Sequence, residues 1–494
     1  MTTTDTIPHW LTKRAHLTPN RVAIVFEGDE ITFQQLKEKS LEKAYLLASL
    51  GVREGSHVAV LSQNSLEFTY ILHGLTYLGA IAVPLNTRLT KQEISYQIND
   101  AECLHFIYED SFKEFAERVK QDCLIVRSAS FAQLNELEPL KHGTKEELKL
   151  QDTSTIIYTS GTTGFPKGVV LTYGNHWWSA IGSALNLGIG ERDKWSASLP
   201  LFHVGGLAIL VRSLVYGMTV HLHRKFDAEE VHHEIMHKGV TMVSVVSVML
   251  DKLLTLQGED RYPDSFRCML LGGGPAPRPL LQRAKERHVP VFQTYGMTET
   301  ASQIVTLSAE DTLRKLGSAG KPLFQAQIKI VSDEREAAPE EVGEIHVKGP
   351  SVTSGYFKQW QANNDKFQDG WLATGDLGYL DEDGYLYVLD RRSDLIISGG
   401  ENVYPAEIES TLNAHPAVRE SGVIGVPHEE WGQVPVAFIV VDQVITEEEL
   451  LEFSIERLAK YKVPHAIHTI QSLPRNASNK LVRRELVHLW EERK

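Results

Sequence analysis

Short apolar runs alternate with longer segments of helical periodicity over roughly the first 340 residues. Three runs are rich in β-branched side chains, as buried strands are: 22–26, 57–63 and 80–85. Two intervening segments carry apolar residues at helical spacing and end in Gly51 or Gly79, which we expect to terminate helices: 32–51 and 65–79. Similar pieces follow at 154–160, 217–223, 240–254 and 267–274. This alternation predicts an α/β fold.

The pattern changes after about residue 340, where short apolar runs are separated by Asp-Gly turns typical of hairpins. These expected strands lie at 344–349, 378–391 and 395–400. The last hundred residues resemble a compact α+β unit. We therefore expect a large N-terminal domain, residues 1–390, built of α/β subdomains plus a β-rich subdomain. A hinge at 391–394 and a small α+β C-terminal domain at 395–494 complete the prediction.

The composition is that of an ordinary globular protein, with 42% hydrophobic and 23% charged residues. The 50 Lys and Arg against 64 Asp and Glu give a formal net charge of −14, which argues against a nucleic-acid binder because such a protein needs a basic surface. Only three cysteines, widely spaced, exclude a disulfide framework and a Cys-based zinc site. The sequence lacks a secretory apolar segment and a membrane span. We therefore expect a cytoplasmic protein.

The segment YTSGTTGFPKG, residues 158–168, is the strongest chemical signal in the sequence. Glycines let backbone N–H groups face a polyphosphate, hydroxyls add donors, and a lysine adds positive charge. The candidate nucleotide ligands are Thr159, Ser160, Gly161, Thr162, Thr163, Gly164 and Lys167. The spacing is not that of a Walker A loop. The string resembles instead the phosphate loop of the adenylate-forming superfamily, which includes acyl-CoA synthetases, luciferases and nonribosomal adenylation domains.

A second string, YGMTET at 295–300, is similar to the next signature of that superfamily. The resemblance implies that Tyr295, followed by Gly296, flanks the adenine of ATP. It also implies that Thr298 meets the α-phosphate, as a nucleotide-binding and catalytic residue. Glu299 would hold Mg²⁺. Together these residues imply a site for ATP with its metal.

Three more strings match the superfamily in the expected order. LLGGGPAP resembles the glycine-rich strand end against which a flat base and an acyl group pack. The resemblance places Gly272 and Gly273 beside the acyl group, and Gly273 and Gly274 beside the nucleotide. In WLATGD, Asp376 would accept hydrogen bonds from the ribose hydroxyls. In LDRRSD, Arg391 would contact the ribose and phosphate.

The catalytic lysine of the superfamily corresponds to Lys480, which would also contact the nucleotide. Because it lies far beyond the expected hinge, closure of a mobile C-terminal domain must carry it to ATP. The resemblance implies that the domain then rotates to admit coenzyme A, with the hinge absorbing the change. The hinge holds Ser393 where the superfamily often has Asp or Lys, so the pivot is left open. No nucleophilic side chain is needed, because the substrate carboxylate itself attacks ATP.

A competing signal is the string His233-Glu234-Ile235-Met236-His237, which has the H-E-x-x-H spacing of zinc peptidases. On a helix both histidines would share a face, and the glutamate could act as a base. A third ligand is not evident downstream, and the surrounding charges are typical of an exposed amphipathic helix. We favour the structural interpretation.

The acid substrate is indicated by weaker signals. Phe202 is followed by His203, where amino-acid-activating domains usually place Asp, so a stand-alone coenzyme A ligase is expected. His203 is predicted to border the acyl pocket as a substrate-binding and catalytic residue. Ser302 and Gln303 are candidate donors to a second carboxylate of the substrate, since an unpaired buried carboxylate is costly.

Longer strings narrow the resemblance to one branch of the superfamily, which joins the aromatic diacid 2-succinylbenzoate to coenzyme A in menaquinone biosynthesis. These strings lie at 183–189, 199–207, 213–220, 295–308, 315–323, 387–410 and 473–481. The implied partners are 2-succinylbenzoate, ATP, Mg²⁺ and coenzyme A, with no nucleic acid and no membrane span, and a homo-oligomer is left open. Other acyl- or aryl-CoA synthetases, a luciferase-like oxygenase and a non-enzymatic ATP-binding protein remain as alternatives.

Overall fold

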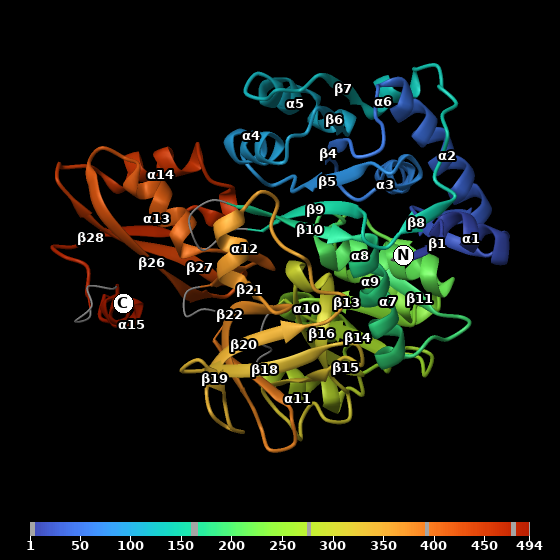
Figure 1. Ribbon diagram of the computed structural model, residues 1–494. Coiled ribbons are helices and arrows are strands. Elements are labelled where there is room, and N and C mark those ends of the chain that lie inside the picture. The colour runs from blue at the N-terminus through green and yellow to red at the C-terminus, as the bar shows by residue number, and fades with distance from the viewer. Residues whose placement is uncertain (1–4, 160–165, 274–277, 391–394, 476–480, 494) are drawn as a thin grey trace. The chain divides into compact units, whose positions relative to one another are not determined.

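The computed structural model describes residues 5–159, 166–273, 278–390, 395–475 and 481–493. The chain forms two compact units (Figure 1). The first comprises Met1–Thr87, Ile98–Ile157 and Gly168–Leu389, and the second comprises Arg88–Gln97, Tyr158–Lys167 and Asp390–Lys494. None of the described helices has the length and apolar character that crossing a bilayer requires. Each unit has its own buried core.

A six-stranded sheet is built from β4 (His57–Leu61), β5 (Ile81–Leu85), β6 (His105–Tyr108), β7 (Arg127–Ser130), β9 (Thr153–Thr159) and β10 (Lys167–Thr172). The strand order is β10-β9-β5-β4-β6-β7, and the pairs of β4 with β5 and β6 are parallel. The helices in this stretch of the chain are α2 (Phe33–Ser49), α3 (Leu66–Leu78), α4 (Lys91–Asp100), α5 (Lys113–Lys120) and α6 (Phe131–Asn135), with the 3-10 turn η1 (Asp110–Phe112). Most of α4 belongs to the second unit. A separate strand pair joins β1 (Thr6–Pro8) to β8 (Glu147–Lys149).

Local sequence explains the ends of α2 and α3. Thr32 caps α2 by accepting a hydrogen bond from the Gln35 amide, which fixes the helix start at the predicted position. Gly79 ends α3 in the left-handed conformation at φ 65°, which glycine adopts without steric cost. The predicted helices and the strands at 57–63 and 80–85 are therefore confirmed to within about two residues.

A larger sheet forms the rest of the first unit. Its strands are β2 (Val22–Phe26), β3 (Asp29–Thr32), β11 (Lys194–Ala197), β12 (Thr219–Leu222), β13 (Met242–Val245), β14 (Cys268–Leu271), β15 (Val291–Met297), β16 (Ser302–Leu307), β17 (Ser318–Pro322), β18 (Gln327–Ser332), β19 (Arg335–Glu336), β20 (Gly343–Lys348), β21 (Phe367–Gln368), β22 (Trp371–Leu380) and β23 (Leu386–Asp390). The order is β19-β18-β20-β22-β23-β17-β16-β15-β14-β13-β11-β12-β2-β3, with β21 paired to β22. The associated helices are α1 (Trp10–Leu17), α7 (Tyr173–Leu187), α8 (Val204–Tyr216), α9 (Ala228–His237), α10 (Ser247–Gln257), α11 (Arg278–Glu286), α12 (Trp360–Lys366) and the 3-10 turn η2 (Thr298–Thr300).

The character of this sheet changes along its length. Strands β12, β11, β13, β14 and β15 run parallel, whereas β16 and the strands beyond it are antiparallel. The antiparallel strands, in yellow and orange in Figure 1, form a β-rich region as expected. It begins at β16, earlier than the change after about residue 340 that the sequence pattern predicted, because β16–β19 lack the Asp-Gly turn signal, and the predicted strand at 395–400 belongs to the second unit. The predicted piece at 240–254 holds strand β13 followed at once by helix α10, because Val246 is extended between them.

The second unit is α+β. Its strands are β24 (Ile396–Ser398), β25 (Glu401–Val403), β26 (Val418–His428), β27 (Gly432–Val441) and β28 (Ala466–Thr469), and its helices are α13 (Pro405–Asn413), α14 (Glu447–Ile455), α15 (Arg483–Glu491) and the 3-10 turn η3 (Lys460–Lys462). Apolar side chains on the two faces of the β26–β27 hairpin form separate cores. Within this unit, the buried Lys462 ammonium lies 2.6 Å from a Glu93 oxygen and 2.7 Å from a Glu407 oxygen.

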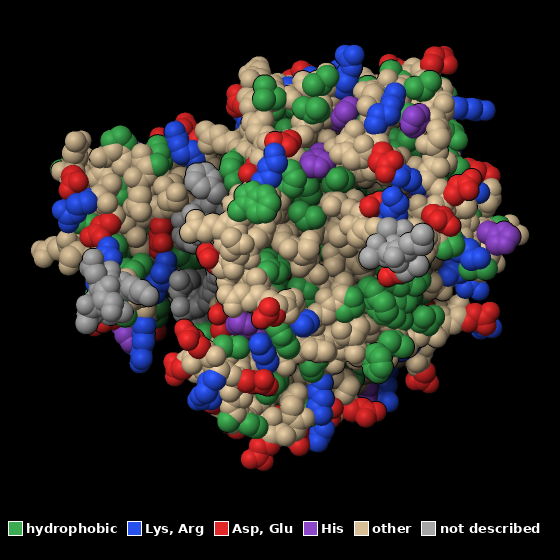
Figure 2. All heavy atoms as spheres, viewed as in Figure 1, with side chains coloured by type: hydrophobic (Ala, Val, Ile, Leu, Met, Phe, Trp, Pro, Cys, Tyr) green, Lys and Arg blue, Asp and Glu red, His purple; other side chains and the backbone are tan. Residues whose placement is uncertain are grey.

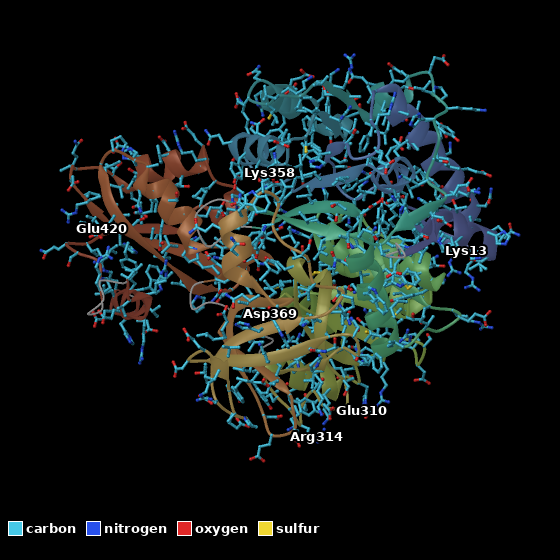
Figure 3. The ribbon with its side chains drawn as sticks, in the orientation of Figure 1. Lys13, Glu310, Arg314, Lys358, Asp369 and Glu420 are labelled. Atoms are coloured by element: carbon cyan, nitrogen blue, oxygen red, sulfur yellow. The ribbon has the colours of Figure 1, made fainter. Side chains whose placement is uncertain are left out.

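Charged side chains of both signs are interspersed over the face shown in Figure 2. Figure 3 labels Lys13, Glu310 and Arg314, three exposed examples from the first unit.

Candidate functional site

The predicted site residues of the first unit gather at one edge of its larger sheet. Because β11, β14 and β15 are parallel, their carboxyl ends meet at the same edge, which is where α/β sheets bind ligands. The segments that leave this edge carry His203 after β11, Gly272 after β14 and Thr298 after β15. Strand β16 starts there with Ser302, because it is antiparallel to β15. The topology thus collects residues that are far apart in sequence.

Tyr295 and Asp376 are joined directly. The Tyr295 hydroxyl donates a hydrogen bond of 2.7 Å to Oδ2 of Asp376. Both side chains are buried, at 3% and 6% exposure. The Asp376 amide is held in turn by the Thr374 hydroxyl at 3.0 Å, which fixes the carboxylate in place. The aromatic residue and the acid predicted for the nucleoside therefore form one rigid pair.

Glu299 is fixed by two contacts from the segment after β20. The Tyr356 hydroxyl donates to Oε1 of Glu299 at 2.8 Å, and the Thr353 amide donates to its carbonyl oxygen at 2.7 Å. The other carboxylate oxygen, Oε2, makes no hydrogen bond to a described residue. One buried carboxylate with an oxygen available suits Mg²⁺, which is usually held by one or two carboxylates plus substrate phosphates.

The turn between β15 and β16 has an unusual backbone. Ala301 and Ser302 have φ of 52° and 103°, values that residues other than glycine rarely adopt. A Cβ on Gly296 would lie 2.1 Å from the Ser302 carbonyl oxygen, so only glycine fits there. The Ser179 hydroxyl anchors the turn by donating to the Ala301 carbonyl at 2.6 Å. Such strain is typical of functional sites, where surrounding contacts maintain it.

Arg212, which the sequence analysis did not single out, lies behind this turn. Its side chain is 1% exposed on α8, and its Nη2 lies 3.3 Å from the Ser302 hydroxyl and 3.4 Å from Oε1 of Gln303. The guanidinium lies 5.1 Å from the ring centroid of Trp195, and its Nε has no hydrogen-bond partner among the described residues. Burial lowers the pKa of this guanidinium.

No described carboxylate forms an ion pair with Arg212. Burying a cation without an anion is costly, so such a group is usually paired with a bound ligand or a water. The sequence signal that could have revealed Arg212 is the single charge in the otherwise apolar helix VGGLAILVRSLVY. The arrangement supplies a donor cluster suited to an anionic group.

His203 caps the amino end of α8. Its carbonyl accepts hydrogen bonds from the Gly206 and Leu207 amides at 3.1 and 3.0 Å, and its ring meets that of Phe202 edge to face at 4.8 Å. Of the two described glycines after β14, Gly273 is exposed with φ 85° and Gly272 is half-buried.

The remaining predicted site residues lie in the second unit or outside the described residues. Thr159 ends β9 and Lys167 begins β10, and both belong to the second unit, where they flank the predicted phosphate loop. The remaining predictions lie outside the described residues: Ser160, Gly161, Thr162, Thr163, Gly164, Gly274, Arg391, Ser393 and Lys480.

The H-E-x-x-H string does not form a metal site. His233 and His237 are exposed on α9, whereas Glu234 points inward, with its carboxylate 2.8 Å from Nδ1 of His221 and 2.9 Å from Nε2 of His223. Those hydrogen bonds and charges outweigh burial and lower the pKa of Glu234 to about 2. Within the described ranges, no group of three or more His, Cys, Asp or Glu could hold a metal ion. Glu234 therefore has a structural role and is not a catalytic base. The expectation of an exposed charged helix holds for His233 and His237 but not for Glu234, which faces inward.

Comparison with known protein families matches the two parts of the chain separately. Residues 11–357 match the model of the AMP-binding enzyme, and residues 407–480 match that of the AMP-binding enzyme C-terminal domain. The chain belongs to the AMP-binding enzyme family. The adenylate-forming fold expected from the motifs, with a large N-terminal and a small C-terminal domain, is thereby confirmed.

Individual members of the AMP-binding enzyme family are similar over nearly the whole chain. The 2-succinylbenzoate–CoA ligase of Bacillus anthracis (strain A0248) is 53% identical over 488 residues, covering 99% of each chain. The o-succinylbenzoate CoA synthetase (MenE) of Bacillus subtilis bound to its product analogue OSB-NCoA, a double mutant, is 49% identical, with a TM-score of 0.94 and 98% of each chain covered. The same Bacillus subtilis enzyme with the acyl-adenylate OSB-AMP is 49% identical, with a TM-score of 0.77 and 98% of each chain covered. In complex with ATP and magnesium it is 49% identical, with a TM-score of 0.76, covering 98% of this chain and 100% of that one.

Proposed function

We infer that this AMP-binding enzyme is an acid–thiol ligase that converts 2-succinylbenzoate, ATP and coenzyme A to 2-succinylbenzoyl-CoA, AMP and diphosphate, in menaquinone biosynthesis. Full-length relatives at 53% identity carry this activity in their names, and relatives of known structure bind the acyl-adenylate and a coenzyme A product analogue. The order of motifs from the phosphate loop to Lys480 supports the same reaction.

The reaction proceeds in two displacements. In the first, an oxygen of the aliphatic carboxylate bonds to the α-phosphorus of ATP, and the bond from that phosphorus to diphosphate breaks. In the second, the coenzyme A sulfur bonds to the acyl carbon, its proton is lost and AMP leaves. The first transition state concentrates negative charge at phosphorus, so donors and a lysine there accelerate it. We propose Lys480, Thr298 and the phosphate-loop residues for this role, with His203 bordering the entering carboxylate.

The nucleoside half of ATP is proposed to lie against the edge of the larger sheet. Asp376, held by Tyr295, would accept hydrogen bonds from the ribose hydroxyls. Glu299 would hold Mg²⁺, which supplies charge neutralisation to the phosphates when bound. Gly272 and Gly273 leave backbone bare for the base and the acyl group, and Arg391 is proposed for the ribose and phosphate.

The observation that favours a diacid is the buried guanidinium of Arg212. The aliphatic carboxylate of 2-succinylbenzoate is consumed in forming the adenylate, whereas the carboxylate on the ring keeps its charge throughout. Ser302, Gln303 and Arg212 form a donor cluster for that charge, on the buried side of a strained turn. A monoacid would leave the guanidinium without a counter-charge, which explains why this pocket would select a diacid.

A substrate panel tests the assignment. We expect ATP–pyrophosphate exchange with 2-succinylbenzoate, and little with benzoate, 4-coumarate, acetate or 4-oxo-4-phenylbutanoate, which lacks the ring carboxylate. Arg212→Met should lower the preference for 2-succinylbenzoate over 4-oxo-4-phenylbutanoate by about 10- to 100-fold, the value of a hydrogen-bonded charge. Arg212→Lys should restore part of it.

Arg267 provides the matched control, since its charge is already paired with Asp193 at 2.6 Å. Arg267→Met should lower stability and leave the preference between the two acids unchanged. Exchange with a different acid, unaffected by Arg212→Met, would make the chain another acyl- or aryl-CoA synthetase of the same two-step mechanism.

We further propose the division into residues 1–390, a hinge at 391–394 and a mobile domain at 395–494. The match of residues 407–480 to a C-terminal domain supports a boundary before that segment. A cytoplasmic location is proposed as well, supported by the three widely spaced cysteines, which suit a reducing compartment.

A further inference from the structure

Asn64 lies on a buried connection that belongs to no motif of the sequence. It follows β4 at the carboxyl edge of the six-stranded sheet, just before Ser65 caps α3. The side chain is 2% exposed. A buried amide must find partners for its two N–H donors and its oxygen, so the identity of those partners shows what the residue holds.

All of the Asn64 partners are backbone groups of segments that follow strands β11 and β12 of the larger sheet. Its Nδ2 donates to the carbonyl oxygens of Leu199 and His223, at 3.0 Å each. Its Oδ1 accepts a hydrogen bond of 2.8 Å from the Leu201 amide. Leu199 and Leu201 lie in the loop that links β11 to His203 at the start of α8, and His223 follows β12. One side chain thus joins the acyl-pocket loop to two sheets.

The loop is held equally tightly on its other side. The His203 amide donates to the Pro200 carbonyl at 3.1 Å. A Cβ on Gly206 would lie 2.2 Å from that same Pro200 oxygen, so α8 packs directly on the loop backbone. Leu201 and Phe202 are buried, at 0% and 5% exposure. The loop is therefore held by Asn64 on one side and by the start of α8 on the other.

His223, whose carbonyl oxygen accepts a hydrogen bond from Asn64, is itself held by several contacts. The His223 ring lies 3.1 Å from the Ser196 hydroxyl and 2.9 Å from Oε2 of Glu234. The His223 amide also donates to the Ala197 carbonyl at 3.2 Å, extending the parallel pairing of β12 with β11. Because His223 is fixed, the hydrogen bond from Asn64 to its carbonyl oxygen holds Asn64, and with it the loop, in one position.

We propose that Asn64 is a positioning residue for acid recognition: by clamping Leu199 and Leu201 to His223, it sets where Phe202 and His203 stand in the acyl pocket. This inference rests on the proposed function, because it takes His203 to border the acid. Asn64 acts only through the loop. Its effect should appear in binding and adenylation of the acid and be small in binding of ATP.

The test compares Asn64→Ala and Asn64→Asp with the unsubstituted full chain by ATP–pyrophosphate exchange. Asn64→Asp keeps the shape and the acceptor but sets a carboxylate against two carbonyl oxygens, so both variants should lose the clamp. We expect the KM for 2-succinylbenzoate to rise about tenfold or more, because Asn64→Asp loses two hydrogen bonds and Asn64→Ala loses three. The KM for ATP should stay within about twofold.

Asn175→Ala is the matched control, since Asn175 is also buried and also makes two donated bonds, to the Pro350 and Val352 carbonyls, and one accepted bond. It should lower the melting temperature by a similar amount without raising the acid KM selectively. A double-mutant cycle adds a readout that general destabilisation would not move: the effects of Asn64→Ala and His203→Ala on the acid KM should be strongly non-additive.

The outcomes separate the two claims. No exchange with 2-succinylbenzoate in the unsubstituted chain would overturn the proposed function before Asn64 is considered. Normal exchange, combined with equal changes in the acid and ATP KM values or additive effects with His203→Ala, would overturn the positioning role alone.

Discussion

The Tyr295 hydroxyl and the Asp376 carboxylate, 81 residues apart in sequence, share a hydrogen bond of 2.7 Å in a buried environment. The contact links strand β15 of the parallel region to strand β22 of the antiparallel region. As the proposed ribose ligand, an Asp376 carboxylate held in this way would not have to reorganise when ATP binds, and such preorganisation lowers the cost of binding.

Tyr295→Phe should weaken ATP binding while keeping the ring in the core. Asp376 loses a charge-assisted donor, so we expect the KM for ATP to rise about 5- to 20-fold, with a smaller effect on the acid. Initial rates at varied ATP measure this. Tyr379→Phe, whose ring stacks on Tyr387 at 4.8 Å, is the control and should change neither KM. Equal effects of both substitutions would refute the link from Tyr295 to the nucleotide.

Tyr356→Phe should raise the magnesium requirement. The substitution removes the hydroxyl that donates to Oε1 of Glu299 at 2.8 Å but keeps the edge-to-face packing of the ring on Phe367. A less firmly oriented carboxylate binds the metal more weakly, so the half-saturating Mg²⁺ concentration should increase about 3- to 10-fold. Titration of activity with Mg²⁺ at saturating ATP provides the measurement. An unchanged titration curve would mean that Glu299 does not hold the metal.

Lys480→Ala should separate the two half-reactions. We expect adenylate formation to fall by about a thousandfold or more, because transition-state charge on the phosphate loses its lysine. Thioester formation from supplied acyl-adenylate and coenzyme A should remain within about tenfold, since that step does not require the lysine. Single-turnover assays of each step distinguish the effects. A similar loss in both steps would contradict an exchange between two conformations of the C-terminal domain.

Glu234→Gln should remove a pH-dependent part of the stability. Burial lowers the pKa of His223, but the hydrogen bond and charge of Glu234, with help from Glu230, outweigh it and raise that pKa above its usual 6.5. Burial raises the pKa of Glu234, but hydrogen bonds and charges from His221 and His223 outweigh it and lower that pKa from 4.5 to about 2.

The directions of the two pKa shifts define the pH range in which this pair stabilises the fold. The His223 contribution is complete below pH 6.5 and is lost as the pH rises through its raised value, whereas the Glu234 contribution is complete above pH 4.5 and is lost as the pH falls toward 2. The melting temperatures of wild type and Glu234→Gln should therefore differ most between about pH 4.5 and 6.5 and converge on either side. A difference independent of pH would show that the pair is not ionised.

Gly296→Ala should disrupt the turn before β16. The new Cβ would meet the Ser302 carbonyl at 2.1 Å, and a backbone oxygen cannot move aside as a flexible side chain can. We expect a loss of about 2 kcal/mol or more in the free energy of unfolding, together with loss of exchange activity. Gly143→Ala is the control, since nothing lies within 4 Å of its Cβ, and it should change stability by about 0.5 kcal/mol at most. Urea unfolding of both variants measures the difference.

Hydrophobic periodicity and short motifs carried much of what could be predicted. Helices α2 and α3 were located from apolar spacing and their terminal residues because those signals act within a few turns of the chain. The nucleotide motifs around Tyr295 and Asp376 were recognisable because chemistry constrains consecutive residues there. The H-E-x-x-H string shows the limit, since Glu234 is engaged by histidines of β12 and its flank that its own sequence neighbourhood does not reveal.

The sequence by itself determined the α/β character, the family and the residue types that ATP chemistry needs. These depend on local hydrophobic pattern and on motifs made of consecutive residues. Only the tertiary structure decided that Arg212 is buried without a described counter-charge and that Asn64 clamps the loop before His203. Both facts depend on contacts across some 90 to 160 residues of chain. Such contacts arise from how two sheets pack, and no local periodicity records them.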